Sequence, residues 1–196
     1  MLSDPVFLSR IQFAMTVGFH FLFPPITIGL GWLLVITEWF SWKRNDPHYD
    51  RLSRFFAKLF AVTFGVGVAS GIVMEFQFGT NWAAYSKFVG DIFGAPLAAE
   101  VVFAFFLESV FLGLYLFGRD KIPRKWHFFS VVMVAVGALI SAFWILVANS
   151  WQQTPAGYEI RNGRAELTNV FEAVFNDSTI PRVLHTVDAA FVSGAF

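Results

Sequence analysis

The 196-residue sequence contains no cysteine and few charged residues. The absence of cysteine excludes disulfides, thiolate zinc sites, cysteine-ligated iron–sulfur clusters and covalently attached c-type haem. Any metal must therefore be held by histidine, methionine or carboxylate. Charged residues make up only 14% of the chain and the formal net charge is +0, so we expect no broad basic face and no nucleic-acid partner.

Apolar residues are present in large excess. They make up 56% of the chain, with 26 phenylalanines and a mean hydropathy of +0.59, far from the balance of a soluble domain. A transmembrane helix needs about 20 mostly apolar residues. Four stretches fit this pattern, at 13–40, 59–74, 95–117 and 126–147, and a fifth begins near Val183 but is too short to cross. These runs predict an all-α integral membrane protein, a transmembrane helix bundle with about four complete spans and the start of a fifth.

The basic residues between the spans predict the orientation of the bundle. The connections at 42–54 and 119–125 hold four lysines and arginines each, whereas the predicted loop at 75–94 holds only Lys87. Under the positive-inside rule the two basic connections are cytoplasmic. The N-terminus, the loop at 75–94 and a loop at 150–182 between spans four and five are then periplasmic. We expect one membrane domain over 1–196, the N-terminal part of a longer subunit.

Ionisable residues inside the spans are candidates for function, because each costs about 2.5 to 3.5 kcal/mol to insert into a membrane. The predicted topology places His20, Glu100 and His185 in the outer part of three different spans, so we expect these three groups to converge on the periplasmic side. Four other ionisable groups are predicted at solvated positions at span ends or in loops: Glu38, His48, Glu75 and His127.

His20 lies in an apolar run shortly before a double proline. One interpretation is that its ring donates a hydrogen bond to a backbone carbonyl freed by Pro24, since proline lacks the helical N–H. The other is an axial haem ligand, because neutral imidazole is a common ligand of haem iron and Gly18 leaves room for a flat macrocycle.

His185 also has two interpretations. The small residues Ala189, Ala190 and Gly194 that follow it would let a porphyrin lie against the helix, and they suit plain helix–helix packing equally well.

Glu100 and Glu108 lie on one predicted helix, roughly 12 Å apart along its axis. They could form two stations of a proton path, with the hydroxyls of Ser109 and Ser141 as carriers. The alternative is that each carboxyl is a protonated, hydrogen-bonded packing element.

Several segments closely resemble the N-terminal portion of subunit I of the cytochrome bd-type quinol oxidases. They include "LSRIQFAMTVGFHFLFPPITIGL", "MEFQFGTNW", "GAPLAAE", "SAFWILVANSWQQTPAGYEI" and "VLHTVDAAFVSGAF". The resemblance covers almost the whole chain. It implies a terminal respiratory oxidase that oxidises membrane quinol, reduces O2 to water and contributes to the proton gradient.

The resemblance also implies the cofactors and their ligands. The family uses a low-spin haem b and a high-spin pair, haem b with haem d or a third haem b. His20 matches a ligand of a high-spin haem, His185 an axial ligand of the low-spin haem b, and Arg10 a residue that meets haem propionates. Glu100 matches the carboxylate beside the high-spin pair. Positions on the family's proton route from the cytoplasm are matched by Glu108, Ser109 and Ser141.

The expected partners are a second oxidase subunit (subunit II), small single-span subunits, membrane quinol, O2 and the lipid of a bacterial or archaeal cytoplasmic membrane. The methionine that completes the low-spin haem in the family comes from a later helix. Two other functions remain open on the residues alone: a haem-binding electron-transfer or assembly scaffold without oxygen reduction, and a proton-coupled transporter without haem.

Overall fold

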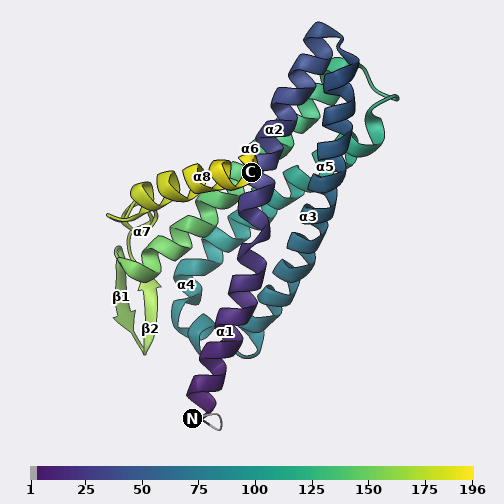
Figure 1. Cartoon of the computed structure of the whole chain (residues 1–196). Coiled ribbons are helices and arrows are strands. Elements are labelled where there is room, and N and C mark those ends of the chain that lie inside the picture. Colours follow the sequence, from purple (N-terminus) through teal and green to yellow (C-terminus); the bar gives the residue numbers. More distant parts are fainter. Residues whose placement is uncertain (1–3) are drawn as a thin grey trace.

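The computed structural model describes residues 4–196 and is a bundle of long helices with one small hairpin on its flank (Figure 1). The elements in chain order are α1 (Pro5–Phe21), α2 (Phe23–Arg44), α3 (Pro47–Gly79), α4 (Ala83–Ala99), the π-helical segment η1 (Glu100–Phe105), α5 (Phe106–Gly118), α6 (Arg124–Gln153), β1 (Tyr158–Arg161), β2 (Arg164–Leu167), α7 (Val170–Val174) and α8 (Thr179–Ala195).

Four continuous helical stretches are long and apolar enough to cross a membrane: 5–44, 47–79, 83–118 and 124–153. The prediction of an all-α, multi-pass membrane bundle is therefore confirmed. Every span extends beyond its predicted bounds. The predicted bounds were too short because the polar and aromatic residues at the helix ends are less hydrophobic than the central residues. These end residues nevertheless continue the helical hydrogen bonding.

Local sequence determines where the first helices begin and end. Asp4 and Asp46 cap α1 and α3 by accepting hydrogen bonds from the backbone N–H groups of Val6 and His48. A proline follows each cap, where its missing N–H costs nothing. Asn45 reverses the chain between α2 and α3 in the left-handed conformation, with φ of 49°.

The predicted loop at 75–94 is wrong. Helix α3 continues to Gly79 and α4 begins at Ala83, so only three residues connect them. Polar side chains hold this tight turn: Trp82 Nε1 donates to Gln12 Oε1 on α1 at 3.1 Å, and Gln12 Nε2 donates to Gln77 Oε1 on α3 at 3.0 Å. These bonds join residues about 70 positions apart, which the sequence pattern could not reveal.

The segment between α6 and α8 carries its own structure. Its two strands pair antiparallel with Tyr158 opposite Leu167, and Asn162 and Gly163, both at positive φ, form the tight turn between them. Buried side chains of the hairpin and α7, namely Ala165 and Ala173, pack with a cluster from α4 and α6. The hairpin is therefore docked on the bundle.

Helix α8 runs from the hairpin toward the middle of α2 (Figure 1). The two helices are in backbone contact, since a Cβ placed on Gly29 would lie 2.6 Å from the Cα of Gly194. This crossing fixes the position of α8, which carries His185.

The connections alternate between the two ends of the bundle. The α2–α3 and α5–α6 turns, which carry the basic residues, lie at one end, and the N-terminal part of α1 and the α3–α4 turn lie at the other (Figure 1). This arrangement is the one that the alternating charge pattern requires. Which end faces the cytoplasm stays a prediction.

Candidate functional site

Glu100 opens the π-helical segment η1, which interrupts the long helix from Ala83 to Gly118. In a regular α-helix, Glu100 and Glu108 would lie about 80° apart around the axis. A π turn holds more residues than an α turn, so it reduces this offset and brings the two carboxyls toward one face. Segments of this kind occur often at functional sites.

Helix α6 receives both carboxyls. Ser141 Oγ donates a hydrogen bond to Glu100 Oε1 at 2.7 Å. One turn earlier on the same face of α6, Gly137 lies against Glu108, because a Cβ added there would lie 2.6 Å from Glu108 Cγ. Gly137 and Ser141, one helical turn apart on α6, thus contact Glu108 and Glu100 respectively.

The two carboxyls differ in their surroundings. Glu108 is buried, with 7% of its surface exposed, and has no hydrogen-bond partner among residues 4–196. Glu100 is half-buried, and it lies close enough to both Glu75 and Glu108 for their charges to interact. Ser109, half-buried beside Glu108, makes no side-chain hydrogen bond within the described part of the chain. Glu100 is therefore at the centre of a row of acids, with Ser141 as its hydroxyl partner.

His20 is half-buried in the last turn of α1 and faces α3. Its Nδ1 lies 3.0 Å from Ser70 Oγ, and its Cε1 would lie 3.1 Å from a Cβ on Gly71. The ring therefore hydrogen-bonds to a neighbouring helix and not to a carbonyl freed by Pro24.

His185 and Arg10 are both exposed, on α8 and α1. Neither side chain has a hydrogen-bond partner within residues 4–196. Over the same residues, no three histidine, aspartate or glutamate side chains come together as a metal-binding group. His20, Glu100 and His185 therefore do not form a shared metal-binding group within the described residues.

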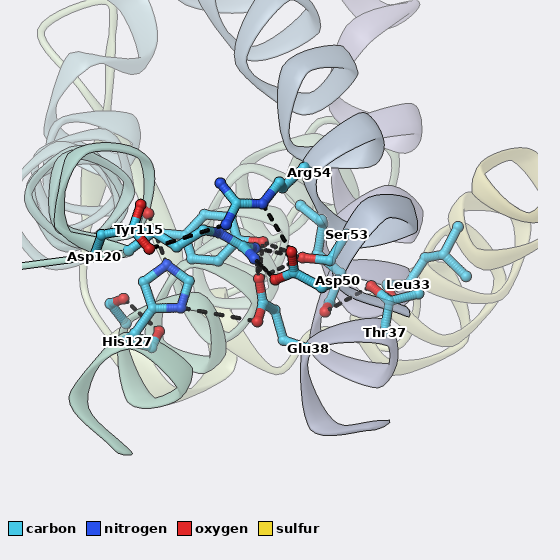
Figure 2. A network of polar contacts seen from close by, with 12 residues as sticks. Leu33, Thr37, Glu38, Asp50, Ser53, Arg54, Tyr115, Asp120 and His127 are labelled. Atoms are coloured by element: carbon cyan, nitrogen blue, oxygen red, sulfur yellow. Dashed lines mark hydrogen bonds and ion pairs between the residues drawn. The ribbon is translucent and has the colours of Figure 1, made fainter. Parts of the chain in front are cut away.

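A second polar cluster lies at the end of the bundle that carries the basic connections (Figure 2). Glu38 Oε1 accepts hydrogen bonds from Ser53, Tyr115 and Arg119, the bond from Tyr115 being 2.8 Å long. Arg119 also pairs with Asp50 at 2.5 Å. These five residues come from α2, α3, α5 and the turn after α5, so the cluster ties these elements together.

Two predictions of solvated residues are wrong in this cluster. Glu38 and His127 are 5% and 4% exposed. His127 Nε2 donates to the Tyr115 carbonyl at 2.9 Å, and its Nδ1 lies 3.8 Å from Glu38 Oε2. Each residue is close to the end of its helix, but a neighbouring helix covers it. The other two, His48 and Glu75, are exposed as predicted.

Apolar residues separate this cluster from Glu108. Tyr115 and Glu108 lie seven residues apart on α5, roughly 10 Å along the axis. The buried side chains around Tyr115 on the inner side are those of Leu112, Val131 and Val134. A cavity of about 120 Å³ adjoins the cluster and is lined by Glu38, Asp50, Arg119 and His127 among others, large enough for water. The cluster thus joins helices at one end, with no hydrogen-bonded link to Glu108 among the described residues.

Comparisons with known proteins agree with the resemblance noted in the sequence. Residues 8–196 match the family model described as cytochrome bd terminal oxidase subunit I. The chain is 46% identical over 189 residues to the cytochrome bd ubiquinol oxidase subunit 1 of Bacillus subtilis, covering 96% of this chain and 40% of that protein. It is 48% identical over 194 residues to the cytochrome bd-II ubiquinol oxidase subunit 1 of Escherichia coli, covering 98% and 38%.

The fold is similar to that of a solved oxidase. The structure of bd oxidase from Geobacillus thermodenitrificans superposes with a TM-score of 0.89 at 33% sequence identity, covering 96% of this chain and 44% of the matched one. The chain therefore spans about two fifths of the length of the relatives it matches.

Proposed function

The chain belongs to the cytochrome bd terminal oxidase subunit I family, and we propose that it contributes haem ligands and a proton path to a larger complex. That complex lies in the cytoplasmic membrane, oxidises quinol and reduces O2 to water. The observation that carries this proposal is that Glu100 and Glu108 contact the same face of α6, where Ser141 donates to Glu100 at 2.7 Å and Gly137 lies against Glu108. Oxygen reduction consumes protons inside an apolar bundle, and a passive haem scaffold has no need of such a path.

The residues fit the haem groups that the family implies. His20 has one ring nitrogen engaged by Ser70, so its Nε2 is free to be a ligand. His185 is exposed on α8, where a haem shared with another segment or subunit could reach it. When bound, the haem groups supply the redox-active iron for electron transfer and O2 reduction. We assign His20 to a high-spin haem, b or d, His185 to a low-spin haem b, and Arg10 to the haem propionates.

The acids have the task of delivering protons. Glu108 lies deeper in the bundle and Glu100 is bonded to Ser141, so a proton taken up at Glu108 can pass toward Glu100 along the α6 face, with Ser109 and Ser141 as hydroxyl carriers. Both serines can accept and donate in turn. With the basic connections in the cytoplasm, uptake from that side would contribute to the proton gradient. A second oxidase subunit, and small single-span subunits, would complete the haem pockets.

The test is the full complex, expressed in a host without other terminal oxidases. We expect its purified form to show haem absorbance bands and quinol-dependent O2 uptake. His20→Ala is expected to lose a high-spin haem and the O2 uptake, because the iron loses its protein ligand. His48→Ala, which alters an exposed histidine, is the matched control and is expected to keep both. A complex without haem bands, or unchanged O2 uptake in His20→Ala, would contradict the proposal.

A further inference from the structure

His20 is held from α3 by a short chain of hydrogen bonds. Its Nδ1 lies 3.0 Å from Ser70 Oγ, and Ser70 Oγ donates to the Gly67 carbonyl at 3.0 Å. The imidazole rests against Gly71, whose lack of a side chain leaves the space that the ring occupies. Two adjacent residues of α3, Ser70 and Gly71, therefore set the position of a ring on α1.

The direction of these hydrogen bonds fixes the state of the ring. A serine hydroxyl has a single proton, and the Gly67 carbonyl can only accept one. Since Ser70 gives its proton to Gly67, its oxygen must accept from His20, and Nδ1 is the donor. The neutral imidazole then has its lone pair on Nε2, the nitrogen that is left to bind a metal.

We propose that Ser70 is a positioning residue for the iron ligand His20, fixing its tautomer and ring orientation and increasing its electron donation to haem iron. The inference rests on the proposed function, in which His20 ligates a haem. Partners of this kind typically change metal affinity by 10- to 100-fold. Gly71 supports this role, because its lack of a side chain lets the His20 ring approach α3 closely enough for the Nδ1–Ser70 hydrogen bond.

A purely structural role for Ser70 makes a different prediction. Serine hydroxyls in helices often bond back to a carbonyl of their own helix and do nothing else. Thr63, earlier on α3, shows this behaviour, because among residues 4–196 its hydroxyl bonds only to the carbonyls of Leu59 and Phe60. If Ser70 were like Thr63, its removal would leave the ligand unaffected.

The experiment uses the purified full complex and compares Ser70→Ala with Thr63→Ala. We expect Ser70→Ala to keep its fold but to bind the high-spin haem about 10- to 100-fold more weakly. The remaining haem is expected to have a raised midpoint potential and a lowered iron–histidine stretching frequency, because a less electron-rich imidazole stabilises ferric iron less. Thr63→Ala is expected to match the wild type in all three measurements.

Gly71→Ala is an independent variant, since a methyl group there would press on His20 Cε1. It is expected to shift the same potential and frequency, whereas Gly65→Ala, with nothing within 4 Å of the added carbon, is expected to change neither. Wild-type values in both Ser70→Ala and Gly71→Ala would overturn the inference. Full retention of the haem in His20→Ala would overturn the proposed function itself, so the two failures are distinguishable.

Discussion

Replacing Arg119 with methionine is expected to destabilise the bundle by about 3 to 5 kcal/mol, because the change leaves the Glu38 carboxylate buried without its counter-charge. The Arg119 side chain is 14% exposed, and Glu38 is buried. Arg119 also bonds to Ser53 and pairs with Asp50, so a single substitution breaks three contacts at once. Since the three partners belong to α2 and α3, and Arg119 itself follows α5, the loss is expected to loosen this whole end of the bundle.

Thermal unfolding of the purified complex measures this effect. Arg161→Met is the matched control, because Arg161 makes an ion pair with Glu159 on the hairpin, where both side chains are exposed to solvent. That variant is expected to melt with the wild type, as surface pairs contribute little. Adding Glu38→Gln to Arg119→Met removes the unpaired charge and is expected to restore part of the stability. Equal melting temperatures for Arg119→Met and Arg161→Met would refute the role given to the cluster.

Glu108→Gln is expected to lower quinol-dependent O2 uptake by about 100-fold or more while leaving the haem spectrum unchanged. The amide matches the carboxyl in size and fits the same seat at Gly137. It cannot release a proton, and the loss of a positioned acid or base typically costs 10²- to 10⁴-fold in rate. Because Glu108 is buried, bulk water has little access to this position and cannot easily take over the proton transfer.

The measurement is O2 uptake by the purified complex at saturating quinol, with the absorbance spectrum recorded on the same sample. Glu159→Gln makes the same chemical change on the exposed hairpin strand and is expected to retain wild-type turnover. Turnover in Glu108→Gln equal to that of Glu159→Gln would exclude Glu108 from the proton path. An altered haem spectrum would instead indicate a structural role for this residue.

The number and kind of long helices could be predicted from the sequence because membrane insertion demands runs of apolar residues. Their ends could not. The turn at 80–82 is held by Gln12, Gln77 and Trp82, which are far apart in the chain, and hydropathy contains no record of such contacts. The fifth apolar run was correctly expected to form a helix, and the Gly29–Gly194 crossing that seats it on α2 became visible only in three dimensions.

The candidate site was predicted by residue type but not by geometry. Ionisable groups in apolar runs identified His20, Glu100, Glu108 and His185, because lipid penalises them. The π segment that aligns Glu100 with Glu108 has no distinct sequence signal, since its residues also suit an α-helix. Glu38 and His127 were predicted at solvated ends because position along a helix does not reveal which neighbour covers a residue.

In the proposed function, imidazoles from two separate helices hold haem iron. The most direct measurement is electron paramagnetic resonance with absorbance on the purified complex carrying His185→Ala, compared with wild type. We expect this variant to lose the low-spin haem signal and to retain the high-spin haem at His20, because α8 keeps its contact with α2 through Gly29 and Gly194. A low-spin signal of wild-type intensity in His185→Ala would contradict it.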